Sequence, residues 1–307
     1  MNSPMTAIGR VPRRTWLRYR FVFLALAPVM VLFIYLRIIP TGQALLMSVF
    51  KWGLIKPAEE FVGLDNYTNL LADDNFRLAL TNTTIFAVAT TIISVALALL
   101  LASVLSRTVS GRLGGALELM YFAPVLVPMV PVTLGWREIF NYNHGILNAA
   151  LDVFGIDKQP WLSDPTLSLI AVIILSVWKQ LGYNMIILIV GMRAIPRIYH
   201  EAASCDGAGA WQQFRWITMP LLAPVTLFVV VITTISSFNV FTQVYVLASD
   251  VQGSPGLLVR VLVYDIFENG FRFFNMGYAA AESVYMLMII LVLAFLQFRF
   301  LRGSGQT

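Results

Sequence analysis

The run TTIFAVATTIISVALALLLASVL, from Thr83 to Leu105, decides the fold class of this chain. It holds no charged side chain, and it exceeds the about 20 apolar residues that a helix needs to cross a hydrocarbon core of about 30 Å. A buried helix of a soluble protein is the alternative interpretation of a single run. Repetition of the pattern along the chain decides between the two.

Five further apolar runs of similar length occur in the 307 residues. Their approximate limits are 21–39, 116–136, 167–190, 221–245 and 277–298. Hydrophobic residues make up 58% of the chain and charged residues 12%, against about 45–50% and about 25% in soluble domains. The sequence therefore predicts an all-α membrane protein with six transmembrane helices. The single cysteine excludes a disulfide scaffold.

Basic residues orient the predicted helices. If the N-terminus is cytoplasmic, 12 of the 21 Lys and Arg residues fall in the inside segments, which are 1–20, 106–115, 191–220 and 299–307. Seven fall in the outside loops, which are 40–82, 137–166 and 246–276. Because segments rich in Arg and Lys stay in the cytoplasm, we expect both termini inside. The chain then divides into a basic N-terminal segment, a six-span domain and a cytoplasmic tail, at 1–20, 21–298 and 299–307.

The sequence offers little support for an enzyme. None of the four lysines is followed by Ser or Thr, so the chain lacks the GxxxxGK[ST] loop that cradles ATP phosphates. Its two histidines, His144 and His200, fall on opposite sides of the membrane in this topology, which argues against a transition-metal site. We expect no catalytic residue, no metal and no cofactor in this chain.

The most informative segment is EAASCDGAGAWQQFRWITMPLLAP, which runs from Glu201 to Pro224 in the longest internal inside segment. It predicts a short helix, a bend at Asp206-Gly207 and a second helix from near Ala208, with Asp206 as the N-cap of the second helix. Several alanines in the segment permit close approach to another surface. A structured loop without a partner is the alternative.

This segment resembles the EAA loop of binding-protein-dependent ABC importer permeases, whose pattern is EAAxxDGAxxxxxFxxIxLPxxxP. Ten of its residues match, namely Glu201, Ala202, Ala203, Asp206, Gly207, Ala208, Phe214, Ile217, Pro220 and Pro224. Met219 stands where leucine is usual. Other stretches, such as FVGLDNYTNLL, PWLSDP, VWKQLGYNM and FNVFTQVYVL, are similar to the carbohydrate branch of the family, which includes maltose and glycerol-phosphate importers.

The resemblance implies a type I importer permease fold in the bacterial inner membrane. It implies a second permease subunit, an ATPase dimer that carries ATP and Mg²⁺, and an extracytoplasmic solute-binding protein as partners. The residues that would couple this chain to the ATPase are Glu201, Ala202, Ala203, Asp206, Gly207, Ala208 and Phe214. The expected solute is a carbohydrate, and a glycerol phosphate or glycerophosphodiester is the alternative. An ion-coupled secondary transporter is the alternative from another class.

Polar side chains within the predicted spans are candidates for the solute pathway, because such groups are expensive in lipid and usually face a cavity or a partner. The candidates are Lys179, Gln180, Tyr183, Asn184, Asn239, Gln243, Glu282 and Tyr285. Amides and aromatic rings suit sugars by hydrogen bonding and ring stacking. The competing interpretation is that the amides bridge helices and that Lys179 and Glu282 form an ion pair.

Overall fold

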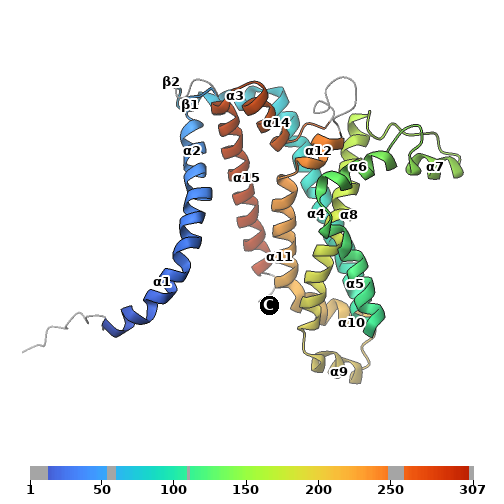
Figure 1. Cartoon of the computed structure of the whole chain (residues 1–307). Coiled ribbons are helices and arrows are strands. Elements are labelled where there is room, and N and C mark those ends of the chain that lie inside the picture. Colours follow the sequence, from blue (N-terminus) through green and yellow to red (C-terminus); the bar gives the residue numbers. More distant parts are fainter. Residues whose placement is uncertain (1–12, 54–59, 109–110, 248–258, 304–307) are drawn as a thin grey trace, which may run out of the picture.

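The computed structural model describes residues 13–53, 60–108, 111–247 and 259–303. Most of the predicted basic N-terminal segment and the end of the predicted tail lie outside these ranges. The chain folds into a helical bundle with two ends, as Figure 1 shows. We call them the α9 end, toward which the first helix begins and the last helix ends, and the α3 end, which carries the hairpin β1–β2 and helices α3, α12 and α14.

The elements follow one another in a simple order along the chain. The helices are α1 Arg13–Phe33, α2 Ile39–Met47, α3 Asp65–Ala72, α4 Asp74–Thr108, α5 Gly111–Leu126, α6 Met129–Ile139, α7 Ile146–Val153, α8 Pro165–Arg193, α9 Arg197–Cys205, α10 Ala210–Gln213, α11 Met219–Phe238, α12 Thr242–Leu247, α14 Leu262–Phe267 and α15 Met276–Gly303. The strands β1 Phe50–Lys51 and β2 Glu60–Phe61 pair antiparallel. Within the described ranges, three π-helical turns lie at Ile34–Ile38, Phe214–Thr218 and Glu268–Arg272.

The described residues contain five helices long and apolar enough to cross a membrane, or six if α5 and α6 count as one broken span. The predicted span over 116–136 is not one continuous helix, because α5 and α6 meet at 99°. Proline causes this break. A residue that precedes proline avoids the α conformation, and Val127 precedes Pro128, which itself has extended backbone at ψ 149°.

Other helix limits also differ from prediction, and α4 begins at Asp74 rather than near residue 83. The first span runs from Val22 to Met47 rather than ending near residue 39. A π-helical turn precedes Pro40 in the first turn of α2 and lets the helix continue past a residue that has no N–H to donate. The fifth predicted run does not reach residue 245 as one helix, because α11 ends at Phe238 and the chain turns at Asn239 before α12 begins.

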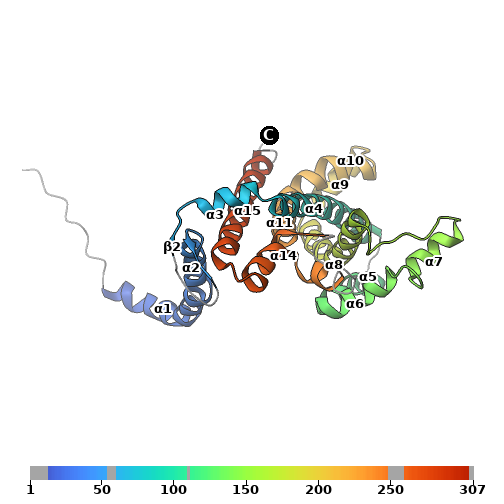
Figure 2. The same ribbon diagram turned by 90° about the horizontal axis from the view of Figure 1, so that it is seen from above.

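Helix α8 is the centre of the bundle. It packs most extensively against α4 and also contacts α5, α11 and α12. Helix α15 contacts both α11 and α2. Figure 2 shows the same arrangement from above, with α1 and α7 reaching out on opposite sides. The α1–α2 span buries none of its apolar window against the rest of this chain, so its side chains are left for lipid or another subunit.

The contact between α5 and α8 depends on one glycine. A Cβ added at Gly182 of α8 would overlap the carbonyl oxygen of Tyr121 in α5, and the Cα of Phe122 lies 2.9 Å from the same point. Backbone atoms cannot give way as a flexible side chain does. Helices approach this closely in membranes only where a small residue faces the neighbouring backbone.

We therefore expect Gly182→Ala to destabilise the purified chain by about 1–3 kcal/mol, the usual cost of overpacking. The measurement is thermal unfolding in detergent. Gly42→Ala is the control, because a Cβ at Gly42, also in a membrane helix, meets nothing within 4 Å. Equal melting temperatures for the two variants would contradict the close α5–α8 contact.

Candidate functional site

The predicted helix–bend–helix is present at the α9 end. Helix α9 ends at Cys205, Gly207 has a left-handed φ of +80°, and α10 begins at Ala210. Glycine adopts that conformation without the steric cost that a Cβ brings. The expected N-cap role of Asp206 is wrong, because Asp206 is the C-cap residue of α9 and Gly209 precedes α10. The Gln212 side chain accepts a hydrogen bond from the Gly209 N–H at 2.7 Å, which satisfies that end of the helix.

Hydrogen bonds from one side chain hold α9 and α10 together. The Gln213 amide nitrogen donates to the Ser204 hydroxyl and to the Ala208 carbonyl, each at 3.0 Å. The Gln213 carbonyl oxygen lies 3.3 Å from Nδ1 of His200. Gln213 therefore contacts residues before and after the Gly207 bend. The turn is a single braced unit rather than two loosely joined helices.

The predicted coupling residues share this turn. Glu201, Ala202, Asp206 and Gly207 are exposed, whereas Ala203, Ala208 and Phe214 are half-buried. The ring of Phe214 packs against Trp211, with 5.7 Å between ring centroids. Trp211 is 71% exposed, so this aromatic pair continues the exposed face of the turn. Small residues beside an exposed indole make a surface that another protein can approach closely.

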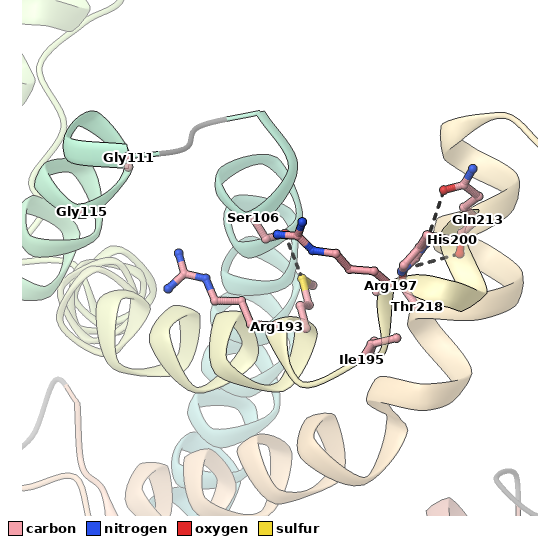
Figure 3. Close-up of a pocket in the computed structure, with 11 residues that line it drawn as sticks. Ser106, Gly111, Gly115, Arg193, Ile195, Arg197, His200, Gln213 and Thr218 are labelled. Atoms are coloured by element: carbon pink, nitrogen blue, oxygen red, sulfur yellow. Dashed lines mark hydrogen bonds between the residues drawn. The ribbon is translucent and has the colours of Figure 1, made fainter. Parts of the chain in front are cut away.

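A cavity of about 670 Å³ lies behind the turn, where the ends of α4 and α8 meet the start of α5 (Figure 3). Arg197 reaches across it toward Ser106, and Arg193 points toward the Gly115 side. Arg193 forms an ion pair with Glu118 of α5. The ion pair ties the end of α8 to α5, immediately before the chain enters α9. The hydrogen bonds of Gln213 and this ion pair were missed from the sequence, because both partners of each contact come from different helices.

Asn184 lies at the contact of three helices. Its Nδ2 donates to the Ser94 hydroxyl of α4 at 2.9 Å, and its Oδ1 accepts from the Thr233 hydroxyl of α11 at 3.3 Å. The residue is 1% exposed. Of the two interpretations given to the amides, this placement favours a bridge between helices. Spacing along α8 could identify the face on which Asn184 lies, but not its partners on other helices.

Lys179 and Glu282 do not form the ion pair that the sequence suggested. The Lys179 ammonium donates to the carbonyl oxygens of Pro124 and Val127, each at 2.5 Å. These carbonyls lie at the α5–α6 break, where proline removes the helical donors, and Lys179 replaces them. Glu282 is fully buried in α15 and accepts a hydrogen bond from Asn269 at 3.0 Å.

The other candidate pathway residues belong to several different helices or their ends. Tyr183 is 45% exposed on α8, and Gln180 is half-buried one turn earlier. Asn239 is exposed at the end of α11, and Gln243 is half-buried in α12. The remaining candidate, the ring of Tyr285, packs edge-to-face on Phe76 with centroids 5.3 Å apart. Of the eight candidates, Asn184 and Glu282 are buried, and the other six keep some surface that a solute or a second subunit can contact; Tyr183 and Asn239 are the exposed ones.

A family model matches this chain. The model described as the inner membrane component of binding-protein-dependent transport systems matches residues 94–304. The chain is 34% identical over 278 residues to UgpA of Agrobacterium fabrum, an sn-glycerol-3-phosphate transport system permease protein. That alignment covers 91% of this chain and 93% of the relative. It is 29% identical over 274 residues to MalF of Thermococcus litoralis, a trehalose/maltose transport system permease protein. That alignment covers 89% of this chain and 90% of the relative.

A solved structure has the same fold. A chain of the bacterial alginate ABC transporter, determined in complex with an alginate pentasaccharide-bound periplasmic protein, superposes with a TM-score of 0.83. The superposition covers 96% of this chain and 98% of that chain, at 20% identity. The two chains therefore share one fold over almost their whole length.

The bridge made by Asn184 generates a test of its role. We expect Asn184→Ala to lower the free energy of unfolding by about 0.5–2 kcal/mol, the range of buried interhelical hydrogen bonds in membranes, and to leave the solute concentration for half-maximal uptake unchanged. Gln180→Ala, one turn away on α8, is the control that should leave thermal stability unchanged. A weaker apparent affinity for solute in Asn184→Ala, with the wild-type melting temperature, would contradict a purely bridging role.

Proposed function

This chain belongs to the family of inner membrane components of binding-protein-dependent transport systems, and from that premise we propose that it imports a carbohydrate as one of two permease subunits around an ATP-driven pore. It is a multi-pass membrane protein of that family. The α9 end is cytoplasmic and both termini lie inside, with α5 and α6 together as the third of six spans. The solute arrives from an extracytoplasmic binding protein at the α3 end.

The braced turn between α9 and α10 carries the proposal. Its exposed face, from Glu201 to Phe214, is the contact for a partner ATPase dimer, which holds the ATP and Mg²⁺. A chain without a phosphate-binding loop can do uphill work only through contact with a separate motor. Because Gln213 braces the turn and Arg193 ties α8 to α5, a push on α9 moves helices rather than bending a loop. Two packings of the bundle then give alternating access.

The candidate pathway residues favour a neutral polyhydroxylated solute. Gln180, Asn239 and Gln243 are amides that donate and accept hydrogen bonds, and Tyr183 offers an exposed ring for stacking. The ammonium group of Lys179 on α8 donates its hydrogen bonds to backbone carbonyls, so it is not available to pair with a phosphate. The trehalose/maltose relative supports this choice. The sn-glycerol-3-phosphate relative supports the phosphoester as second candidate, which would draw its cationic contacts from the other permease.

The coupling role is tested at Gly207. A β-branched residue there is strained at φ +80°, so we expect Gly207→Val to distort the turn, to abolish uptake and to release the ATPase during co-purification. The chain itself should remain in the membrane. The control is Gly155→Val, which introduces the same side chain at a similar φ of +70° in a loop at the other end. Normal uptake by Gly207→Val in an assembled transporter would contradict coupling through this turn.

The solute class is tested separately. Uptake by the reconstituted transporter is measured for oligosaccharides and for glycerol phosphate, with and without ATP. We expect ATP-dependent uptake of an oligosaccharide. Uptake of the phosphoester alone would leave the coupling proposal standing and replace the solute. Uptake driven by an ion gradient without the ATPase would support a secondary transporter and contradict both proposals.

A further inference from the structure

A buried group of charges joins α14 to the first turns of α15 at the α3 end. Arg260 is 5% exposed, and its Nε donates to Oδ1 of Asp265 at 2.6 Å. The same guanidinium lies 3.2 Å from Oε2 of Glu268, whose other oxygen pairs with Arg272 at 3.1 Å. These contacts satisfy Arg260, Glu268 and Arg272. They leave the second oxygen of Asp265 without a donor.

A second carboxyl group near Asp265, that of Glu282, also has an oxygen that lacks a donor. Glu282 accepts from Asn269 on Oε1 only, and its Oε2 is buried without a partner. The side chains of Asp265 and Glu282 are within hydrogen-bonding reach of each other. Both residues are at least 99% buried, at 1% and 0% exposure. Each oxygen can satisfy the other only if one of them carries a hydrogen.

One added proton brings the net charge of the group to zero. Two guanidinium groups face three carboxyl groups, those of Asp265, Glu268 and Glu282, so full ionisation leaves an excess negative charge in a buried place. Two adjacent carboxylates removed from water cannot both stay ionised, because desolvation and mutual repulsion both oppose it. Burial raises the pKa of the Asp265 carboxyl, and the Arg260 guanidinium only partly opposes that rise.

We propose that Asp265 and Glu282 share one proton between Oδ2 and Oε2, so that the α14–α15 joint is a proton-binding site. The proton comes from water and turns a carboxylate pair into a carboxylic acid that donates to a carboxylate. A metal cation fits less well, because a guanidinium already occupies one side of Asp265. Within the described ranges, no cluster of three or more His, Cys, Asp or Glu residues is arranged to hold a metal ion.

The proton has a structural consequence because this joint contacts α4. The backbone N–H of Leu262 donates to the Thr83 hydroxyl at 2.9 Å, and the Asn82 amide donates to the Arg260 carbonyl at 3.0 Å. Loss of the proton puts two negative charges against each other and pushes α14 away from α15. The titratable and charged groups around the pair, from every element packed against it, are Asp73, Tyr264, Arg260, Glu268, Arg272 and Tyr278.

Infrared spectroscopy of the full chain in detergent tests the shared proton directly. A protonated carboxyl gives a carbonyl band that is separate from carboxylate bands and shifts in heavy water. We expect that band at neutral pH in the wild type and its loss in Glu282→Gln, whose amide donates to Asp265 without a titrating proton. Glu118→Gln is the control, because it removes a carboxylate paired with an arginine at the α9 end, outside this group, and should keep the band. Asp265→Asn should lose the band as Glu282→Gln does.

Thermal stability gives the second readout. A carboxyl whose pKa is higher in the folded state stabilises the protein at low pH, and that stability is lost as the pH rises above the ordinary carboxyl range of about 4 through the folded value. The melting temperature of the wild type and of Glu118→Gln should therefore fall with rising pH, and that of Glu282→Gln should not. Absence of the band in the wild type, its persistence in both pair variants, or a sodium-dependent melting temperature without the band would overturn the proposal.

Discussion

The side-chain amide of Gln213 closes the turn between α9 and α10, and the proposed transmission of force through this loop depends on that closure. It contacts Ser204, Ala208 and His200, which lie on both sides of the Gly207 bend. Helix α8 leads directly into α9, and α10 continues through a π-helical turn into α11. A displacement of the turn therefore reaches two central helices at once. A loop without this brace would absorb the same displacement in its own backbone.

Within the bundle, several polar side chains form hydrogen bonds with backbone or side-chain groups that would otherwise lack a partner. Lys179 supplies donors to carbonyls freed by the proline break, and Asn184 bridges α4 and α11. An unsatisfied polar group in hydrocarbon costs roughly several kcal/mol. Side chains that satisfy such groups are therefore not available to bind a solute. The polar residues that keep exposed surface are the better candidates for the pathway. Among the buried side-chain atoms without a partner in the described residues, only those of Asp265 and Glu282 belong to carboxyl groups, which a shared proton can satisfy.

Periodicity and length in the sequence were sufficient for the helical class, for the positions of most long helices and for the bend at Gly207, because these properties are local. The limits of the first span and the break at Pro128 were not predicted, because a hydropathy run does not report whether a proline is accommodated by a π-helical turn or bends the helix. The sequence also could not predict which residues on other helices a given side chain contacts. The residue types at Lys179 and Glu282 suggested an ion pair, but helix packing separates them and gives each another partner.

Cys205 provides the most direct measurement of what the turn contacts. It is the single cysteine of the sequence and is exposed at the end of α9, so a photo-crosslinker can be attached there without engineering the chain. In the assembled transporter, coupling through α9 predicts a crosslink to an ATP-hydrolysing subunit, with a yield that changes when nucleotide binds. Crosslinks only to lipid, or to the extracytoplasmic solute-binding protein, would contradict it.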